Sequence, residues 1–414
     1  DGSEREMLLN SIMYSSMIGH TSDEINYYIV DYGSESLRRF SNFSSVGGMV
    51  YAGEEDKFKN LIKLIKNEIA RRKKLYSSYG GEYINYINKN DKKEPIKVFV
   101  FNNFDSIFES HQDMYDYLPG LVRDSERYGI IFILTANAIN SVSIKISQNF
   151  GNIYAFRLKD SSDYNTIFNS RKKIELRDIF GRGLLNNGEL HEFQTSSIVS
   201  DSSTLDDYIY EFSKRIDDRK SAKSIPTLPE VVNYDLIKQS ISSLSSVPVG
   251  ISRQELEIVN YDFTLNTGTV ITSSKLLNTT KFINSLVNVL INVQNTDLLF
   301  IDGTGKLDGI RNTVKYFYNS DFENVLNSFN EYFDEIKQYK VSRYQVVIIY
   351  GFDKFMSKLN NKPLFEKFIS SIKSNELFKI VLADDANKIK TYGFESWYTS
   401  LFSNSDGIWI GKGI

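Results

Sequence analysis

The stretch "IKVFVFNNFD" (Ile96 to Asp105) decides the fold class of this 414-residue chain. Its first half is an apolar, β-branched and aromatic run, which is typical of a strand buried on both faces of a parallel sheet. Its second half is polar. The same pattern returns as "YQVVIIYGFDKF" (Tyr344 to Phe355), and the two aspartates Asp105 and Asp353 are 248 residues apart (353 − 105).

The strands around these two stretches repeat as well. Thr135 and Ala383, which follow the next predicted strand of each set, are again 248 residues apart (383 − 135). Equal offsets over two successive strands predict a duplicated domain. The flanking strands are predicted at "NYYIVDYG" (Asn26 to Gly33), "IIFILTAN" (Ile130 to Asn137), "DLLFIDGTG" (Asp297 to Gly305) and "FKIVLADDAN" (Phe378 to Asn387).

Helical periodicity lies between the strands, as in Phe58, Leu61, Ile62, Ile65 and Ile69, so we predict two tandem α/β domains with mainly parallel sheets flanked by helices. The polar stretch from about residue 200 to 247, with Pro248 directly after it, accounts for three of the six prolines and reads as an ordered connector. The predicted domains are residues 1–224 and 225–414. "YSSYGGEYINYINKNDKK" (Tyr76 to Lys93) reads as an insertion in the first copy.

Composition excludes several classes of function. A net charge of −3 gives no general attraction to nucleic acid. The chain has no cysteine, and its three histidines lie far apart in sequence, so no metal site is predicted. Its longest uncharged apolar run, "IIFILTANAI" (Ile130 to Ile139), is about half the ~20 residues of a membrane helix. Because the chain begins at Asp1 without methionine, we expect it to be part of a longer protein.

The start of the chain, "GSEREMLL", occupies the place of a phosphate loop without having its residues. Such a loop reads G-x-x-x-x-G-K-[ST], because backbone N–H groups, a lysine and a metal-binding hydroxyl converge on the phosphates. Here Gly2 and Ser3 lead into Glu4, Arg5 and Glu6. We expect both glutamates beside the phosphate space, where each like-charge contact would oppose binding by up to roughly 4 kcal/mol.

The acidic pair that should hold Mg²⁺ and polarise water is also missing in both copies. The first copy has Asn102 and Asn103 at this position, and the second has Tyr350 and Gly351. Neither pair can act as a base. Hydrolysis is therefore not expected at either copy.

The second phosphate loop is predicted within "VITSSKLLNTTKFINSL" (Val270 to Leu286), a strand, a polar turn and a helix. Asn278 stands where the lysine should be and Thr279 where the hydroxyl should be. Without glycine, the backbone cannot approach a phosphate closely. Lys275 and Thr279 are the groups that we expect to reach an anion. The candidate residues of this vestigial loop are Thr272, Ser273, Ser274, Lys275, Asn278 and Thr279.

Together these stretches resemble a known family. "YYIVDYG", "FVFNNFDSI", "FILTANAINSVSIKISQNFGNIYAFRLKDSSDYNTIF", "FGRGLL" and "HEFQT" are similar to an FtsK/SpoIIIE-type ATPase domain of type VII secretion coupling proteins. "IPTLPEVV", "VPVGISRQELEIVNYDF" and the closing "GIWIGKG" (Gly407 to Gly413) resemble the junction to that family's last ATPase domain and its end. The resemblance covers nearly the whole chain.

The resemblance implies the second and third ATPase domains, RecA-like P-loop NTPase folds, of an EssC-type coupling protein of a type VIIb system. It implies a membrane-anchored hexamer at the cytoplasmic face of the bacterial cell membrane, with WXG100 substrates and other secretion components as partners. It aligns Gly2 to Glu6 and Thr272 to Thr279 with the two phosphate loops, and Asn102 and Tyr350 with the two magnesium-site aspartates. No cofactor is predicted for this chain, although ATP and magnesium would serve the full-length protein.

Three hypotheses follow from these residues. The leading one is a binding and regulatory module for secretion substrates, with degenerate nucleotide sites. The alternatives are an active ATP-driven translocase of protein or DNA, and an unrelated α/β scaffold. No substrate-binding surface is predicted, because the aromatic residues most open to such a role are expected in the core: Phe317, Tyr318, Phe394, Trp397 and Tyr398.

Overall fold

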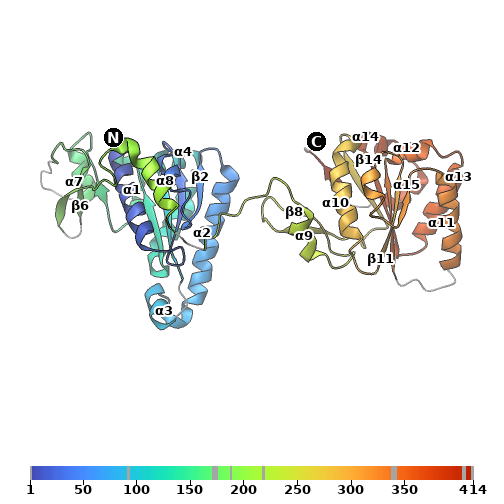
Figure 1. Ribbon diagram of the computed structural model, residues 1–414, viewed down its shortest axis with the longest axis horizontal. Helices are drawn as coiled ribbons and strands as arrows, with labels where there is room; N and C mark the ends of the chain where they lie inside the picture. Colours follow the sequence, from blue (N-terminus) through green and yellow to red (C-terminus); the bar gives the residue numbers. More distant parts are fainter. Residues whose placement is uncertain are drawn as a thin grey trace. The chain divides into compact units, whose positions relative to one another are not determined.

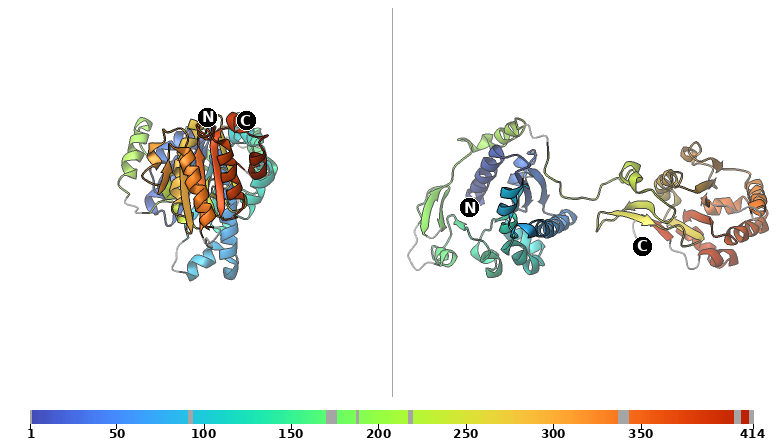
Figure 2. Two further views of the ribbon diagram at one scale, coloured as in Figure 1. Left: turned by 90° about the vertical axis from the view of Figure 1, so that its right-hand side faces the viewer. Right: turned by 90° about the horizontal axis from the view of Figure 1, so that it is seen from below.

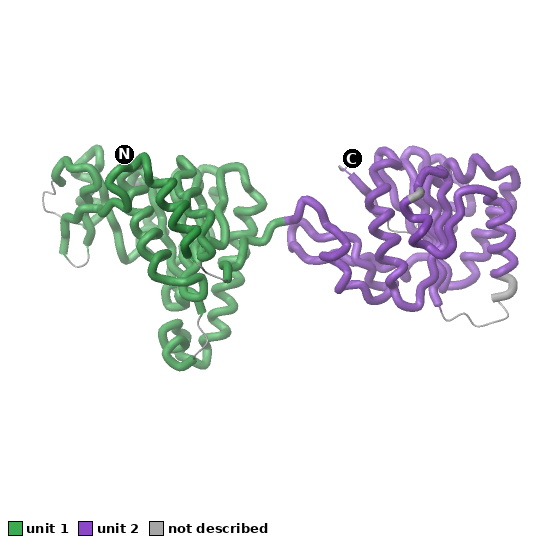
Figure 3. Tube along the Cα trace, viewed as in Figure 1, with its two compact units in different colours: residues 1–227 green, residues 228–414 purple. Residues whose placement is uncertain are grey.

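The chain forms two compact units, residues 1–227 and residues 228–414 (Figure 3). The computed structural model describes residues 2–90, 94–169, 176–186, 189–216, 220–336, 343–402 and 407–411. Each unit contains a parallel sheet with helices on its two faces (Figures 1 and 2), in agreement with the predicted α/β class.

The first unit contains the elements of residues 1–227. They are α1 (Gly2–Gly19), β1 (Ile25–Asp31), η1 (Ser36–Phe40), β2 (Val46–Tyr51), α2 (Glu55–Leu75), η2 (Ser77–Tyr79), α3 (Tyr83–Lys89), β3 (Ile96–Asn102), α4 (Phe104–Ser110), α5 (Met114–Arg123), η3 (Glu126–Tyr128), β4 (Ile130–Leu134), η4 (Ile139–Ser141), α6 (Ile144–Ser147), β5 (Tyr154–Ala155), α7 (Ser162–Phe168), β6 (Arg182–Asn186), β7 (Leu190–Gln194), η5 (Ser202–Thr204) and α8 (Leu205–Ser213).

The second unit contains the remaining elements. They are α9 (Tyr234–Ile237), η6 (Lys238–Ser240), β8 (Val247–Ile251), β9 (Ile258–Tyr261), β10 (Gly268–Ser273), η7 (Leu276–Thr279), α10 (Thr280–Leu290), β11 (Thr296–Asp302), η8 (Asp308–Ile310), β12 (Tyr316–Tyr318), α11 (Phe322–Ile336), β13 (Tyr344–Tyr350), α12 (Phe352–Ser357), α13 (Lys362–Lys373), β14 (Phe378–Asp385), α14 (Ala386–Thr391), α15 (Ser396–Phe402) and β15 (Gly407–Ile410).

The two parallel sheets share a common order of strands. The first runs β2-β1-β3-β4 and the second runs β12-β11-β13-β14-β10-β15. In the first sheet Asp31 pairs with Asn102, and in the second Asp302 pairs with Tyr350. The repeat predicted from the sequence is therefore present strand by strand. The second sheet continues past β14 into β10 and β15, whereas β4 is the outermost strand of the first sheet within the described residues.

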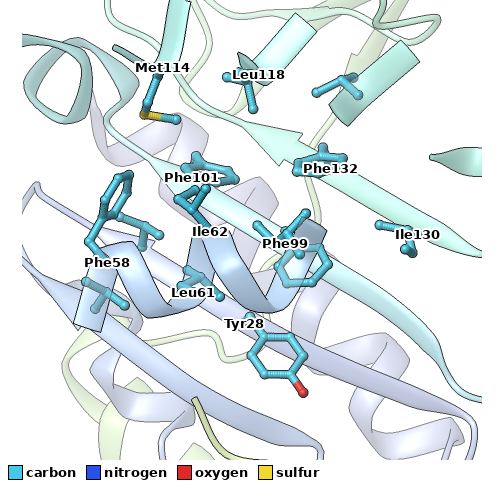
Figure 4. Close-up of a cluster of buried hydrophobic side chains, with 14 of the residues drawn as sticks. Tyr28, Phe58, Leu61, Ile62, Phe99, Phe101, Met114, Leu118, Ile130 and Phe132 are labelled. Carbon is cyan, nitrogen blue, oxygen red and sulfur yellow. The ribbon is translucent and has the colours of Figure 1, made fainter. Parts of the chain in front are cut away.

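The strands are buried because their side chains alternate between two apolar layers. On one face of the first sheet, Tyr28, Phe99 and Phe101 pack against helices α2 and α5 (Figure 4). On the other face, Ile29 and Val100 pack with residues of α1, η1 and α8. In the second unit α11, α12, α13 and α15 cover one face, while α10 and the β8–β9 hairpin cover the other.

Some segments differ from their predicted form. Helix α1 starts at Gly2, so Gly2 to Glu6 form its first turns and not a loop. The predicted insertion consists of η2 and α3, and its residues 91–93 lie outside the described part. The predicted connector contributes α8 to the core of the first unit, where Ile209 is fully buried. The closing segment forms β15, and residues 412–414 lie outside the described part.

The predicted core aromatics divide into two groups. Trp397 is buried, and Phe317 and Tyr398 pack partly buried against the two cores of the second unit. Phe394, in contrast, is 97% exposed and Tyr318 is 38% exposed, so the prediction was wrong for both. Phe394 lies in the turn between α14 and α15, and Tyr318 ends β12 at the edge of its sheet, where neither meets a covering layer.

Candidate functional site

The polar ends of the parallel strands form the candidate site of each unit. In open α/β sheets, ligands bind outside the carboxyl ends of the strands, where helix N-termini also gather. Nearly all predicted site residues lie at these ends. We therefore describe the two strand ends separately, beginning with the buried aspartate of each.

Asp31 anchors the site of the first unit. It is fully buried at the end of β1, and its Oδ1 accepts hydrogen bonds from Asn102 Nδ2 (2.9 Å) and the Gly33 N–H (3.1 Å). Its Oδ2 accepts from the Leu37 N–H (3.2 Å). Burial raises the pKa of Asp31, although these three hydrogen bonds act in the opposite direction. This carboxylate therefore holds the loop after β1.

Asn102 continues the network across the sheet. Its Oδ1 accepts a hydrogen bond from Thr135 Oγ1 (2.7 Å), which in turn accepts from the Asn103 N–H (2.9 Å). The Asn103 Oδ1 accepts from Asn137 Nδ2 (2.7 Å). The backbone of Asn103 is left-handed (φ 62°), which turns the chain sharply from β3 into α4. Asn102 and Asn103 are therefore bound to the protein's own polar groups.

The first turns of α1 reach this network through Arg5. Its guanidinium donates to the Ala136 carbonyl and to Asn137 Oδ1. Glu6 accepts from Ser34 Oγ (2.6 Å) in the loop after β1. Glu4 departs from the prediction, because it is buried and its Oε1 accepts from the Gly181 N–H (3.0 Å), next to β6. Ser3 is exposed, and Gly2 begins the helix.

In the second unit, Asp302 has the same role as Asp31. It is fully buried, and it accepts hydrogen bonds from the Thr304 N–H (2.9 Å), the Thr304 hydroxyl (2.6 Å) and the Leu307 N–H (2.8 Å). Tyr350 lies beside it in the sheet, at the position of Asn102. Its phenol is within 2.8 Å of Thr280 Oγ1, at the start of α10. Burial raises the pKa of Tyr350, so the phenol is neutral at physiological pH.

The predicted second phosphate loop is a strand, turn and helix, as expected, but its hydroxyl groups face inward. Thr279 is fully buried and its Oγ1 donates to the Leu276 carbonyl (2.7 Å). Ser273 is also buried and donates to the Lys275 carbonyl. In this structure the Thr279 hydroxyl is therefore bound to the chain's own backbone and not presented to solvent. Thr272 is half-buried, while Ser274, Lys275 and Asn278 are exposed.

Acidic residues that the sequence analysis did not single out complete this site. The Asp385 carboxylate accepts from the Leu276 N–H in the loop. Asp384 is fully buried and accepts from the Asp353 N–H (2.7 Å), and burial raises its pKa. Lys388 Nζ lies 3.7–3.8 Å from carboxylate oxygens of Asp353, Asp384 and Asp385.

The missed residues have a signal in the sequence. Asp385 and Asn137 are separated by the repeat offset of 248 (385 − 137), and each contacts a segment at the start of a helix earlier in its own unit, Leu276 in η7 or Arg5 in α1. Within the described part of the chain, no group of three or more His, Cys, Asp or Glu residues could hold a metal ion. No described helix combines the length and the hydropathy that a bilayer crossing requires.

Two cavities lie apart from these strand ends. One of about 360 Å³ in the first unit lies between the η1–β2 loop and the end of α8, and Ser41, Phe43 and Ser213 line it. Another of about 350 Å³ in the second unit is more apolar and lies between β8 and α10. Its lining residues are Val232, Ile237, Pro248, Val249, Gly250, Ile251, Lys281, Phe282, Ser285, Leu286 and Val289.

Comparison with known proteins finds that the chain is similar to type VII secretion proteins. It is 21% identical over 373 residues to the type VII secretion system protein EssC of Staphylococcus aureus, and 24% identical over 257 residues to the ESX secretion system protein YukB of Bacillus subtilis. These matches cover 86% and 59% of this chain but only 25% and 17% of the relatives. The chain thus spans about a quarter or less of their length. No family model matches.

The fold matches solved structures of an EssC and an EccC protein. ATPases 2 and 3 of EssC from Geobacillus thermodenitrificans superpose with a TM-score of 0.80 at 18% identity, over 98% of this chain and 81% of that one. ATPases 2 and 3 of Thermomonospora curvata EccC, solved with a signal sequence peptide, give a TM-score of 0.60 at 15% identity, over 98% of this chain and 78% of that one. The chain is homologous to the EssC and YukB proteins and has the tandem fold of EssC ATPases 2 and 3, as predicted.

Proposed function

We propose that this chain is a binding and regulatory module of a type VII secretion coupling protein, with two degenerate nucleotide sites. In the full-length protein it would act at the cytoplasmic face of the membrane, within a hexamer, together with other membrane components of the secretion system. The observation that carries this proposal is the internal hydrogen bonding at both strand ends, where the chain's own groups use the positions that a nucleotide would need.

ATP with Mg²⁺ is the group that this fold family implies, and the residues present fit it poorly. A phosphate loop offers free backbone N–H groups, but the Leu276 N–H already donates to Asp385. A magnesium site needs carboxylate and hydroxyl oxygens, but Asn102 and Tyr350 stand at the acidic positions. Asp31 and Asp302 are buried, and each accepts three hydrogen bonds from the protein. These contacts support a role without nucleotide hydrolysis.

The proposed partner is a WXG100-type secretion substrate, bound through its C-terminal signal. The related EccC structure was solved with a signal sequence peptide, which supports a peptide as the ligand of this fold. The cavity between β8 and α10 offers such a peptide an apolar surface, and Lys281 in its lining could pair with an acidic group of the peptide. We propose this cavity as the place where the signal docks.

Titration of the chain with a WXG100 dimer carrying its C-terminal tail, and separately with ATP, tests the proposal. We expect calorimetry to detect tail-dependent binding, and a coupled assay to detect no Mg²⁺-dependent ATP turnover. A turnover rate that disappears when Arg5 or Thr279 is changed would refute the proposed function and favour the active translocase.

A matched pair of variants tests the docking place. Ser285 is exposed on α10 and lines the cavity, whereas Asn288 is exposed on the same helix without lining it. Ser285→Trp would fill the cavity and should weaken tail binding at least tenfold, which corresponds to about 1.4 kcal/mol. Asn288→Trp should leave the affinity unchanged. Equal affinities for both variants would place the signal elsewhere.

A further inference from the structure

The loop between β10 and α10 contacts a carboxylate of its own chain. Asp385, the last residue of β14, pairs in register with Ser273, the last residue of β10. This pairing places the Asp385 side chain at the start of the loop, where its Oδ1 accepts from the Leu276 N–H. A carboxylate oxygen on a loop N–H occupies the position that a phosphate oxygen takes in a working loop.

A second contact closes the other half of the same site. The Tyr350 phenol, which is 4% exposed, lies 2.8 Å from the Thr280 hydroxyl at the start of α10. In a working site the metal ion is bound by the loop hydroxyl, a position that Thr279, next to Thr280, takes in this chain, and the Tyr350 phenol is also in hydrogen-bond contact with Thr279. Here the hydroxyl is paired with a neutral phenol. Each half of the loop thus has an internal partner.

The first unit independently shows an arrangement of the same kind. Asn137 stands at the repeat position of Asp385, and its Oδ1 accepts from Arg5 in the first turns of α1. The residue types differ, but in both copies a side chain at the end of the same strand contacts a segment at the start of a helix earlier in the unit. Both units thus use a side chain at the strand end to bond the segment where a phosphate loop would lie. This points to a shared internal contact at that position, in addition to the absence of the phosphate-loop residues.

Charge around Asp385 reinforces the contact. Lys388 lies 3.7 Å from the free Asp385 oxygen, and the same ammonium group serves Asp353 and Asp384. Three carboxylates thus share this one ammonium group beside the loop, which carries a cation of its own at Lys275. The Asp385 carboxylate would repel a phosphate that approached the Leu276 N–H.

We infer that the second unit excludes nucleotide phosphate by this internal contact, with Asp385 as the built-in occupant of the anion position and Tyr350 as that of the metal position. The inference rests on the proposed function, because it explains how an ATPase fold can serve as a binding module. It goes further because it attributes the exclusion of phosphate to the side chains of Asp385 and Tyr350, and not to the absence of the glycines and the lysine of a phosphate loop.

Hydrogen exchange and ATP titration of the full chain test the inference together. Asp385→Ala removes the acceptor, so amide exchange in a peptide covering Leu276 should accelerate at least tenfold, and the affinity for ATP should rise at least tenfold over that of the wild type. Asp385→Asn keeps an acceptor oxygen and should exchange within about threefold of the wild type. Asp385→Ser, with a side chain too short to reach Leu276, serves as a second opening variant.

Asp353→Ala is the charge-matched control, because Asp353 contacts Lys388 but not the loop. It should leave exchange as in the wild type and raise ATP affinity less than threefold, because it removes a nearby charge without opening the loop. Equal effects of Asp353→Ala and Asp385→Ala would overturn the inference in favour of charge alone. Faster exchange without any gain in ATP affinity would overturn it as well. Binding of the signal peptide is measured on the same variants, so that failure of the inference is distinguished from failure of the proposed function.

Discussion

Asn102 donates to one buried acceptor and accepts from another group at the same time. Its Nδ2 donates to the fully buried Asp31, and its Oδ1 accepts from Thr135. An aspartate at this position would place two carboxylates against each other without solvent. The Asn102 amide therefore satisfies both of its neighbours. This gives a structural reason for an asparagine at a position where a magnesium site would have an aspartate.

Asn102→Asp should destabilise the first unit by about 2–3 kcal/mol at pH 7, because a donor becomes a second buried charge. Burial already raises the pKa of Asp31, and a second carboxylate would raise it further. The penalty is fully present above this raised pKa and disappears as the pH falls and the pair takes up a proton. Urea denaturation at pH 7 and pH 5 measures it, with the exposed Asn140→Asp as control. A penalty independent of pH would contradict the argument.

Glu68 and Arg72 form a buried ion pair on α2. Arg72 is fully buried, and its Nε donates to Glu68 Oε1 (2.6 Å) while its other nitrogens donate to backbone carbonyls. Burial by itself would raise the pKa of Glu68, but hydrogen bonding from Arg71 and the charges of Lys97 and Arg72 lower it to about 2. The pair ties α2 to the segments before β3 and β4.

Glu68→Gln should therefore cost the first unit roughly 3 kcal/mol at pH 7, at 1.36 kcal/mol per pKa unit. A lowered folded-state pKa gives stability that is present above the unfolded pKa and is lost as the pH falls toward 2. At pH 3 the difference should shrink to about 1.4 kcal/mol. Urea denaturation at both pH values, compared with the exposed Glu109→Gln, measures this change. A constant difference would show that Glu68 contributes by shape alone.

At the scale of elements, left-handed residues between strand and helix shape both sites. Gly351 (φ 69°) precedes α12 as Asn103 (φ 62°) precedes α4. A Cβ at Gly351 would also collide with Thr304, which binds Asp302. The turn therefore positions the Asp302 loop as well as the helix.

Gly351→Ala should destabilise the second unit by about 1–3 kcal/mol, the cost of a left-handed non-glycine residue with a close contact. Gly250→Ala is a suitable control, because Gly250 lies in β8 with open space where its Cβ would be and without a positive φ. Thermal unfolding of the second unit should separate the two variants. Similar melting temperatures would mean that the backbone relaxes around the new methyl group.

The sequence predicts the long central strands well and the short edge elements poorly. The strands at Asn26, Ile96, Ile130, Asp297, Tyr344 and Phe378 lie where the buried apolar runs predict them. β2 and β12 at the sheet edges, the β5–β6–β7 sheet and the β8–β9 hairpin were not predicted, because short or half-exposed strands carry weak patterns.

Within the site, position along the strands could be predicted but side-chain direction could not. The offset of 248 aligned Asn102 with Tyr350 correctly in register. The Thr279 hydroxyl bonds the Leu276 carbonyl, 3 residues earlier, and Glu4 bonds the Gly181 N–H, 177 residues later. The phosphate-loop motif does not encode either partner. Asp385 was read as part of a polar strand end, although the repeat offset connects it to Asn137.

At the scale of the whole molecule, the chain consists of two units, each with its own apolar cores. We therefore expect residues 1–227 and 228–414 to fold when expressed separately. Urea denaturation of an equal mixture of the halves should reproduce the curve of the full chain. Loss of cooperative unfolding in either half would contradict this division, and a cut inside α2 provides a control that should fail to fold.

In the 414-residue chain, β4 is the outermost strand of the first sheet among the described residues, which has a consequence for how this chain behaves at high concentration. A strand at a sheet edge offers backbone groups to any extended peptide, and Ile131 on β4 is 41% exposed beside them. Self-association of the chain should therefore begin by edge-to-edge addition at β4. Ile131→Lys should suppress the concentration-dependent rise in sedimentation coefficient, while Leu265→Lys, at an exposed apolar residue of the second unit, should not.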